Sequence, residues 1–403
     1  MSTFKPDDRK LNLSTKLVHA SPASAEGFHS QAMPVYRGSS TFFDNTTAQR
    51  AHVDVLGLDY SYGLHGNPTQ YTLAQQLAHT EGAKHALVCP SGLAAIMLVA
   101  TACLKHGDHW LIPSNVYGPV QTLAHQLYTD YGVEFDEYDP CDVGSLQAAL
   151  QANTKLIWAE APGSLTFEVP DLSTMVKLAQ AHGARTAIDN TWSAGLVFKP
   201  FEHGFDYSVQ ALTKYQCGHA DVLMGAVLAN NTPAFAEVER RNRVFGLGVG
   251  PDDCSLVLRG LLTLPLRFEH QAKQALELAK RLQAHPAVAS VLHPALPGCP
   301  GHSHFMQLFT GSASIFSVML KQSFSDEQAC SVIDRLKLFR IAYSWGGPES
   351  LGLVVNIPNA RRQQLARQLS HAPGPILRLA IGLEDVEDLW QDLQQAFDTL
   401  NAP

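Results

Sequence analysis

The stretch HALVCPSGLAAIMLVATACL, residues 85–104, joins two apolar patterns of different length. HALVCP (85–90) is short and predicts a buried strand. GLAAIMLVATACL (92–104) is long enough for several turns of helix and predicts the helix after that strand. Ser91 and Gly92 stand at the turn between the two. The stretch therefore predicts a β-strand that turns directly into an α-helix, the repeating unit of α/β folds.

Similar short apolar runs continue along the chain to about residue 230 and alternate with helical patterns. A helical pattern near 171–183 ends at Gly183, a residue that commonly terminates helices. Strands that are apolar almost throughout and are separated by helices are typical of a buried, mostly parallel sheet. The further strands expected in this sheet are HWLIPS (109–114), KLIWAE (155–160), RTAIDN (185–190) and ADVLMGAVLA (220–229).

The C-terminal part predicts a second, smaller α/β domain. A long, partly interrupted helix is expected over 255–285, and a loop between elements over 297–311. Strands are expected at 312–320, 351–357 and 376–382, with helices near 326–336 and 384–400. We therefore expect three parts: an N-terminal arm (1–60), a large domain (61–255) and a small domain (256–403).

Composition and charge exclude several classes of protein. The 403 residues are 45% hydrophobic and 16% charged, which is typical of a soluble globular protein. A net charge of −8 without a Lys/Arg cluster gives no basic surface for nucleic acid. The N-terminus has no secretory h-region, and no apolar run reaches the ~20 residues that a membrane span needs. The cysteines are scattered without a CxxC pair, which favours reduced thiols in a cytoplasmic protein.

One lysine lies in the mostly apolar and small-residue stretch QALTKYQCGHADVLMGAV (210–227). Lys214 is open to three interpretations: a surface lysine, a neighbour of a metal site, or a lysine that acts through its amine. A zinc-type site needs paired ligands at regular spacing. Two groups of candidate ligands lack that spacing, so no metal site is predicted: Cys217, His219 and Asp221, and Cys299, His302 and His304.

Two further positions favour the amine interpretation of Lys214. The backbone N–H groups at the Ser91–Gly92 turn could hold a phosphate, or the turn could simply be tight. Asp189 stands at the carboxyl end of a predicted strand, where it could face a ligand or cap a helix. A phosphate cradle, an acid and a lysine amine together suit pyridoxal 5′-phosphate. There is no Walker A or GxSxG motif, and FGLGVG (245–250) lacks the context of a dinucleotide site.

On these residues the chain resembles the cysteine/methionine-metabolism branch of the fold-type I pyridoxal phosphate enzymes, and within it the bacterial cystathionine β-lyases. The resemblance extends from about residue 15 to 400. It implies a large domain with a mostly parallel sheet and a smaller C-terminal α/β domain. The motifs that carry it are YGLHGNPTQYTL (62–73), PSGLAAI (90–96), EAPGSLTFEVPD (160–171), AIDNTWSAGLVFKPFEHGFDYSVQALTKYQCGHAD (187–221), YSWGGPESL (343–351) and LRLAIGLEDVEDL (377–389).

The resemblance implies a role for each matching residue. Lys214 forms the Schiff base with pyridoxal phosphate and transfers protons. Asp189 pairs with the pyridine nitrogen, and Tyr117 stacks on the ring. The phosphate is held by the backbone N–H groups of Gly92 and Leu93 and by the hydroxyl of Thr213.

The resemblance also implies a substrate site and an assembly. Arg378 holds the α-carboxylate of an amino-acid substrate, with Ser344 and Trp345 beside it. An arginine in an apolar strand is costly unless it has an anion to bind. Tyr62 reaches the phosphate of a neighbouring subunit, which implies shared active sites and a homotetramer built from dimers.

Two positions depart from the wider family. Leu64 stands where relatives usually carry a phosphate-binding arginine, so a cation is missing there, or is supplied by His65 or from elsewhere. Ala211 replaces a serine that binds phosphate in many relatives, as in some β-lyases.

The resemblance further implies a reaction. EAPGSLTFEVPD and YSWGG have the β-lyase form, where γ enzymes usually carry an ESPTNP-like stretch. The expected activity is α,β-elimination of L-cystathionine to homocysteine, pyruvate and ammonia, a step of methionine biosynthesis by transsulfuration. A lyase acting on cysteine, cystine or methionine, a γ-lyase or γ-synthase, and an inactive binding protein of the same fold are the alternatives.

Overall fold

The computed structural model describes residues 11–18, 32–51 and 60–401. The chain forms two compact units, one of residues 1–102 and 209–265 and the other of residues 103–208 and 266–403. Much of the predicted N-terminal arm (1–60) falls outside the described residues. The expected domain boundaries after residues 60 and 255 stay predictions.

Two sheets organise the fold, and they confirm the expected architecture of a mostly parallel sheet with a smaller α/β part. The larger sheet has the order β1-β7-β6-β5-β4-β2-β3, and the smaller has the order β10-β11-β9-β8. Parallel pairs join β2 to β3 and to β4, and β4 to β5, whereas β1 and β7 are antiparallel. The strands of the larger sheet are β1 (His85–Cys89), β2 (His109–Pro113), β3 (Glu134–Tyr138), β4 (Thr154–Glu160), β5 (Arg185–Asp189), β6 (Tyr207–Ala211) and β7 (Gly225–Ala229). Those of the smaller sheet are β8 (Val288–Leu292), β9 (Ile315–Leu320), β10 (Leu351–Val355) and β11 (Ile376–Ala380).

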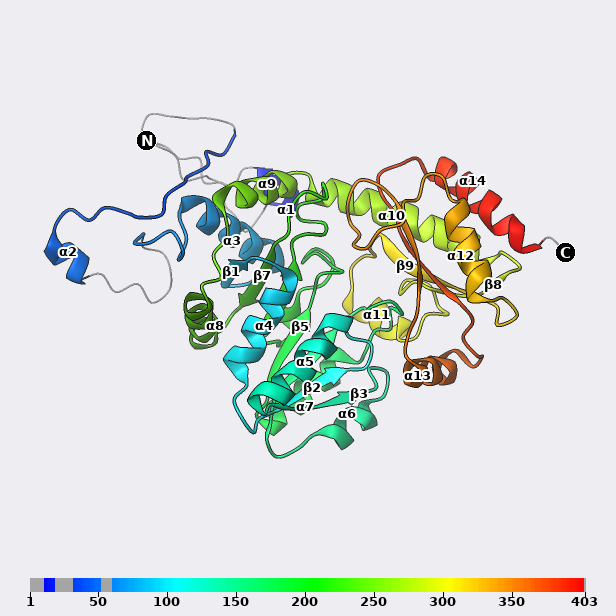
Figure 1. The fold of residues 1–403 in the computed structure, drawn as a ribbon, viewed down its shortest axis with the longest axis horizontal. Helices are drawn as coiled ribbons and strands as arrows, with labels where there is room; N and C mark the ends of the chain where they lie inside the picture. The colour runs from blue at the N-terminus through cyan, green and yellow to red at the C-terminus, as the bar shows by residue number, and fades with distance from the viewer. Residues whose placement is uncertain (1–10, 19–31, 52–59, 402–403) are drawn as a thin grey trace. The chain divides into compact units, whose positions relative to one another are not determined.

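Figure 1 shows the helices, and two of them begin or end with recognisable capping signals. Helix α3 starts with a capping box of Asn67 and Gln70, and Gly183 ends α7 in the left-handed conformation, as the sequence predicts. The first helices are α1 (Leu13–Val18), α2 (Thr46–Ala51), α3 (Pro68–Glu81), α4 (Gly92–Cys103), α5 (Gly118–Tyr131), α6 (Val143–Ala149), α7 (Leu172–His182) and α8 (Thr232–Phe245). The others are α9 (Pro251–Leu261), α10 (Leu264–Gln283), α11 (His302–Leu308), α12 (Asp326–Arg335), α13 (Asn359–Leu369) and α14 (Val386–Phe397), with 3₁₀ turns η1 (Pro200–His203) and η2 (Asp398–Asn401).

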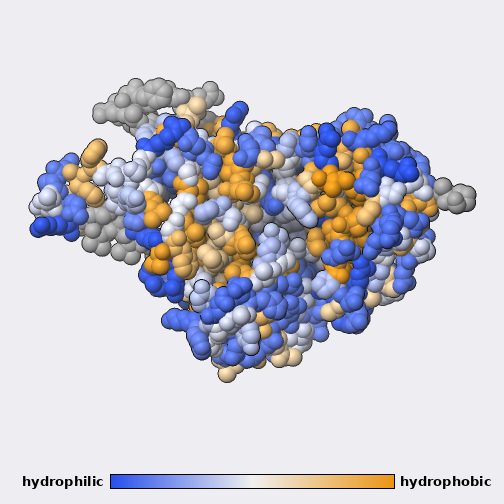
Figure 2. All heavy atoms as spheres, in the orientation of Figure 1, coloured by the Kyte–Doolittle hydropathy of each residue, from blue (hydrophilic) through white to orange (hydrophobic). Residues whose placement is uncertain are grey.

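In the first unit, helix α4 comes after strand β1 and a two-residue turn, as the sequence predicts. The helix carries no charged residue, and half-buried positions leave apolar surface over it (Figure 2). Strand β7 is buried along its whole length. The buried strand β7 therefore packs against the turn between β1 and α4.

In the second unit, the antiparallel sheet packs against amphipathic helices in one apolar cluster. Leu389 and Leu393 of α14, Val332 of α12 and Phe316 and Val318 of β9 are all fully buried in it. Burying side chains of this size contributes roughly 1.5–3 kcal/mol each. Figure 1 shows α10, α12 and α14 beside this sheet. Strand β11, which carries Arg378, is held between β10 and β9.

Three sequence expectations differ from the structure. The segment 297–311 contains helix α11 and is not all loop. The helix expected over 255–285 is two helices, α9 and α10, and Pro265 is in the first turn of α10, where proline is well tolerated. The strand expected over 220–229 begins only at Gly225. In the parts of the chain that the structure covers, no helix is both long and apolar enough to cross a membrane.

His293 gives the fold a predictable response to acid. Its ring is fully buried after β8, its Nδ1 accepts a hydrogen bond from the Ala295 N–H at 3.2 Å, and burial lowers its pKa to about 4. The unfolded chain binds a proton at this residue near pH 6.5, whereas the folded chain does not. Stability is therefore present above that pH and is lost as the pH falls towards 4, by about 3 kcal/mol at most.

We expect His293→Gln to have a smaller decrease in melting temperature between pH 7 and pH 4.5 than the wild type. Calorimetry at several pH values measures this directly. His182→Gln, at an exposed position on α7, is the matched control and keeps the wild-type pH dependence. If the melting temperature of His293→Gln fell with pH as steeply as that of the wild type, His293 would not be the cause of the acid response.

Candidate active site

The predicted site residues fall into one group in each unit, and in the second unit the structure brings Tyr117 close to Asp189, and Arg378 close to Ser344. Site residues in the first unit belong to the turn after β1, the turn after β6 and the segment before α3. Those in the second unit belong to the start of α5, the end of β5, the segment before β10 and strand β11. The first group is Tyr62, Gly92, Leu93, Thr213 and Lys214, and the second is Tyr117, Asp189, Ser344, Trp345 and Arg378.

The start of helix α4 has the donor set of an anion site. The Ser91 hydroxyl accepts from the Ala94 N–H at 3.0 Å, and the Ser91 carbonyl accepts from the Ala95 N–H at 3.1 Å. In the described part of the chain, the N–H groups of Gly92 and Leu93 have no acceptor. Free N–H groups at a helix N-terminus bind phosphate well. This turn therefore fits the phosphate of pyridoxal phosphate.

Close packing explains why this turn needs Gly92. A Cβ atom on Gly92 would lie 2.8 Å from the Cβ of Ala211, and a Cβ on Gly225 would lie 2.2 Å from the Ser91 carbonyl oxygen. Strands β6 and β7 thus pack directly against the turn. A side chain at either glycine would push the turn away from these strands. Ala211 is the residue that replaces the family's serine, and it forms this contact.

Lys214 lies in a turn that is anchored on both sides. Its N–H donates to the Ala211 carbonyl at 3.1 Å, and its carbonyl accepts from the Gly218 N–H at 2.9 Å. The lysine is partly buried, and the next residue, Tyr215, is completely buried. Gln216 donates to Gln210, which in turn donates to Glu81, and all three side chains are buried. This chain of contacts fixes the backbone that presents the lysine.

The Thr213 hydroxyl already has backbone partners. It donates to the Met224 carbonyl at 3.2 Å and accepts from the Met224 N–H at 3.0 Å. A hydroxyl has a single proton to donate. The predicted contact of Thr213 with phosphate therefore requires this proton to turn away from Met224, and it stays a prediction.

In the second unit, Tyr117, Asp189 and Glu160 form one group. Glu160 and Asp189 are the last residues of β4 and β5 and are direct partners in the parallel register. The Tyr117 N–H donates to Glu160 Oε2 at 2.6 Å. Burial, together with the nearby charges of Asp189 and Glu160, raises the pKa of Tyr117 above its usual value. The phenol therefore stays protonated at neutral pH, and its ring is 45% exposed, as a stacking surface must be.

Glu160 is a member of this group that sequence patterns did not single out. Its pKa is raised well above the usual range by burial and then by the Asp189 charge, while the Tyr117 N–H acts in the opposite direction. Its position as the last residue of the strand KLIWAE, parallel to the position of Asp189 in RTAIDN, was the available signal. Asp189 also accepts from the Thr191 N–H at 3.0 Å, which orients its carboxylate.

Arg378 projects from the middle of strand β11. It is paired with Leu353 of β10 and Ser317 of β9. Its Nη2 donates to the Ser344 carbonyl at 3.2 Å, and within the described ranges no carboxylate forms an ion pair with it. Burial lowers the pKa of Arg378, with Tyr343 acting in the opposite direction. A partly buried guanidinium with one neutral acceptor is well suited to bind a carboxylate.

The Arg378 partner is a residue in an unusual conformation. Ser344 has a φ of 78°, in the left-handed region that a residue other than glycine rarely adopts. This conformation belongs to the segment that points the Ser344 carbonyl at the guanidinium. Trp345 is the next residue, so both residues predicted to lie beside Arg378 are in that segment.

The segment before α3 contains Tyr62, Leu64 and His65. Tyr62 is half exposed, and its ring meets the His65 ring edge-on with centroids 6.2 Å apart. Leu64 lies beside Gly248, where an added Cβ would be 2.9 Å from the leucine side chain. The reach of Tyr62 to a neighbouring subunit, the homotetramer and the cytoplasmic location stay predictions.

The two groups of possible metal ligands make other contacts. Cys217 Sγ donates to the Thr213 carbonyl at 3.5 Å, and His219 Nδ1 lies 2.6 Å from the Cys217 carbonyl. Cys299 Sγ contacts the Phe167 carbonyl, and His302 Nδ1 contacts the Pro294 carbonyl. Over the described ranges, three potential metal ligands nowhere come together.

The close contact at Gly92 generates a prediction about cofactor binding. Gly92→Ala places a methyl group 2.8 Å from Ala211 and displaces the N–H groups of the turn. We expect the affinity of the apo-protein for pyridoxal phosphate to fall at least about tenfold, equivalent to 1.4 kcal/mol. Fluorescence titration of apo-protein measures the affinity. Gly298→Ala, where the added Cβ meets no atom within 4 Å, should bind as the wild type does. Wild-type affinity in Gly92→Ala would disprove the phosphate assignment.

Comparison with known proteins agrees with this geometry. The family model described as Cys/Met metabolism PLP-dependent enzyme matches residues 14–398. The cystathionine beta-lyase MetC of Escherichia coli (strain K12) is 36% identical, over 97% of this chain and 98% of its own length. An L-alanine/L-glutamate racemase of Wolbachia pipientis wMel is also 36% identical, over 91% of this chain and 92% of its own length.

A solved structure is similar over the same extent. It is a cystathionine gamma synthase from Xanthomonas oryzae pv. oryzae, in complex with aminoacrylate and cysteine, with a TM-score of 0.87 and 30% identity over 97% of this chain and 99% of that one. The turn at Gly92, the lysine turn and the Tyr117–Asp189 group are thus found in a chain that matches this family over nearly its whole length. The chain belongs to the Cys/Met metabolism family of pyridoxal phosphate-dependent enzymes, and pyridoxal 5′-phosphate is its cofactor.

Proposed function

We propose that this enzyme is a carbon–sulfur β-lyase that converts L-cystathionine and water to L-homocysteine, pyruvate and ammonia, a step of methionine biosynthesis. Arg378 is the observation that carries the proposal. Its guanidinium is partly buried, its pKa is lowered by burial, and one backbone carbonyl is its acceptor among the described residues. An amino-acid α-carboxylate would supply the missing charge, with two parallel hydrogen bonds.

In the proposed site, the cofactor is held by residues from several turns. The N–H groups of Gly92 and Leu93 would bind its phosphate, Asp189 would accept from its pyridine nitrogen, and Tyr117 would cover its ring. When bound, pyridoxal phosphate supplies an electron sink that acidifies the α-carbon of the attached amino acid. Glu160 is occupied by the Tyr117 N–H, so Asp189 is the carboxyl of this pair that the proposal assigns to the pyridine nitrogen.

Lys214 and Tyr117 move the protons in this proposal. The Lys214 amine would take the α-proton of the substrate. The bond between Cβ and sulfur breaks, and the sulfur leaves with a proton from Lys214 or from the Tyr117 phenol. Tyr117 can donate because its raised pKa keeps it protonated. The three-carbon fragment is released and reacts with water to give pyruvate and ammonia, which balances the reaction.

The segment after β4 supports β-elimination over γ-chemistry. EAPGSLTFEVPD (160–171) has the β-lyase form, where γ enzymes usually carry an ESPTNP-like stretch. A Cβ on Gly163 would lie 1.9 Å from Asn115 Nδ2, so the structure here is built around a glycine. The E. coli relative is a β-lyase.

Racemisation is the second candidate, because a relative named as an alanine/glutamate racemase is as similar as the β-lyase. Racemase and lyase both begin by removing the α-proton, so Lys214 and Asp189 serve either reaction. The two reactions differ in the next step, in which a racemase returns a proton to the α-carbon, whereas a lyase expels a group from Cβ.

Parallel assays separate these activities. We expect pyruvate and homocysteine from L-cystathionine to form faster than any product from L-cysteine, L-cystine, L-methionine, L-alanine or L-glutamate. Lys214→Ala should lower kcat about 10²–10⁴-fold, the usual contribution of a group that transfers protons. A predominance of 2-oxobutyrate from cystathionine would indicate a γ-lyase, and faster formation of D-alanine would indicate a racemase.

The Arg378 assignment predicts how a conservative change separates substrate binding from cofactor binding. Arg378→Lys keeps the charge but loses the fork that binds both carboxylate oxygens. We expect kcat/KM to fall about 10–100-fold, mainly through a higher KM, because hydrogen bonds to a charged group contribute about 1.5–3 kcal/mol. Pyridoxal phosphate content should stay unchanged. Arg335→Lys, at an exposed position, is the control. A normal KM in Arg378→Lys would remove Arg378 from the substrate site.

A further inference from the structure

Arg361 is a buried cation at an unusual place. It is the third residue of α13, where the helix dipole disfavours positive charge, and it is only 4% exposed. Its Nη2 forms an ion pair with Glu168 Oε1 at 2.5 Å, and Glu168 is fully buried. The location is unfavourable for the helix itself, so contacts outside the helix account for the arginine.

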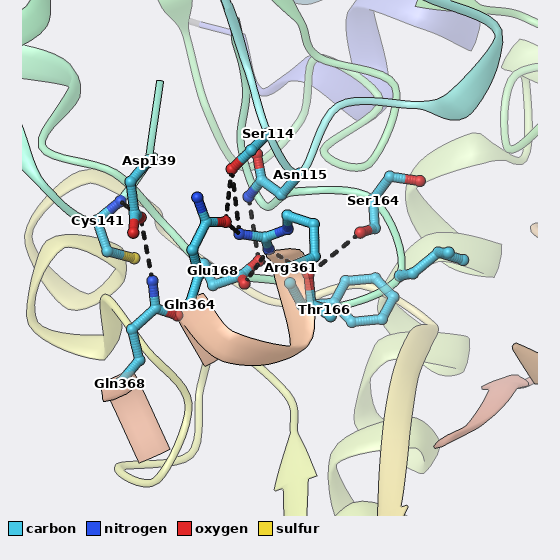
Figure 3. A network of polar contacts seen from close by, with 12 residues as sticks. Ser114, Asn115, Asp139, Cys141, Ser164, Thr166, Glu168, Arg361, Gln364 and Gln368 are labelled. Atoms are coloured by element: carbon cyan, nitrogen blue, oxygen red, sulfur yellow. Dashed lines mark hydrogen bonds and ion pairs between the residues drawn. The ribbon is translucent and has the colours of Figure 1, made fainter. Parts of the chain in front are cut away.

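The rest of the guanidinium binds residues from three segments (Figure 3). Nη2 also donates to the Thr166 hydroxyl at 3.1 Å, and Nη1 donates to the Ser114 hydroxyl at 3.2 Å and to Gln364 Oε1 at 2.6 Å. The Ser114 hydroxyl donates in turn to the same oxygen of Gln364 at 2.9 Å. Arg361 thus ties helix α13 to the segment after β2 and to the segment after β4.

Glu168 extends this network to Asn115, the residue after Ser114. Its Oε2 accepts from Asn115 Nδ2 at 3.1 Å and from the Thr166 hydroxyl at 2.6 Å. The Asn115 carbonyl accepts from the Ser164 N–H at 2.8 Å. Ser114 and Asn115 are therefore both held by side chains that Arg361 organises.

These two residues lead directly into Tyr117. Asn115 is two positions before it, and the Tyr117 N–H is bound by Glu160 at 2.6 Å. Glu160 begins the segment 160–168, and Thr166 and Glu168 end it. The chain before Tyr117 and the segment opposite it are thus fastened to each other and to Arg361. A shift of the guanidinium would be passed to the backbone that carries the tyrosine ring.

Stability alone does not account for a charged pair here. Burying two charges costs solvation, and apolar residues of the same volume often stabilise a protein as well or better. A buried pair held by hydrogen bonds from several segments instead fixes one geometry. We propose that Arg361, acting through Glu168, Ser114 and Asn115, is a positioning residue that sets the place of Tyr117 against the cofactor ring. This rests on the role of Tyr117 in the proposed function.

A double-mutant cycle on cofactor affinity tests the proposal. The variants are Arg361→Met, Tyr117→Ala and the combination. We expect Arg361→Met to weaken pyridoxal phosphate binding about 10–100-fold, since misplacing a group by about 1 Å can cost 10²-fold in function. In the Tyr117→Ala background the same change should weaken binding less than about threefold, because coupled positions are not additive. The visible circular dichroism of the bound cofactor should change equally in Arg361→Met and Tyr117→Ala.

Two further variants distinguish a positioning role from a simple loss of folding. The choice of readout keeps this proposal separate from the proposed function. Arg361→Lys keeps a charge beside Glu168 but cannot reach Ser114 and Thr166 together, so it should show a weaker form of the same effect. Arg367→Met, on the same helix at an exposed side chain, is the control and should bind as the wild type does. Cofactor affinity is measured without cystathionine, so this cycle holds even if the enzyme acts on another substrate.

Three outcomes would overturn the positioning role. One is fully multiplicative losses in the double variant, which would mean that Arg361 acts independently of Tyr117. Another is wild-type affinity in Arg361→Lys together with a lowered melting temperature, which would indicate a merely structural pair. The last is wild-type affinity in Tyr117→Ala, which would remove the residue being positioned.

Discussion

The parallel, in-register pairing of β4 with β5 is the constraint on which the second unit's part of the site depends. It ends both strands at the same edge and makes Glu160 and Asp189 direct partners. Burial raises the pKa of Glu160, and the neighbouring Asp189 charge raises it further. Glu160 binds the Tyr117 backbone N–H, whereas Asp189 accepts from the Thr191 N–H. The sheet thus gives two identical chemical groups different roles.

The site in each unit holds binding groups that lack a complete set of partners. At the start of α4, two N–H groups have no acceptor among the described residues. On β11, the Arg378 guanidinium is desolvated with a single neutral acceptor. Both are costly for the protein by itself. In the proposed site an anion would relieve each cost, a phosphate in the first case and a carboxylate in the second.

Local sequence predicted the most apolar elements well, but it indicated no strand at β3, β6 or β8 and described some connections wrongly. Apolar runs located β1, β2, β4, β5 and α4 to within one or two residues, because burial on a sheet or helix depends directly on side-chain type. Helix α11 was missed because its glycine- and proline-rich surroundings are typical of a loop. Strand β7 begins at Gly225, which packs against Ser91. This contact joins residues distant in sequence, so the local pattern does not reveal it.

The same limit applies to the candidate site. Lys214, Asp189 and Arg378 stand in motifs that a resemblance can transfer. Arg361 has no such motif, and its importance appears only when helix α13 is seen against Thr166 and Glu168, nearly two hundred positions away. Contacts between distant segments depend on the tertiary fold, and pattern and propensity do not encode them.

The packing of Gly163 against Asn115 also constrains how this chain could diverge. With 1.9 Å between the amide nitrogen and the position of an added Cβ, neither residue can grow alone. A substitution at 163 becomes tolerable only after 115 has become smaller or its backbone has moved, and that backbone continues into Tyr117. Positions 163 and 115 should therefore change as a pair during evolution, so a switch of reaction type through this segment requires at least two coordinated substitutions.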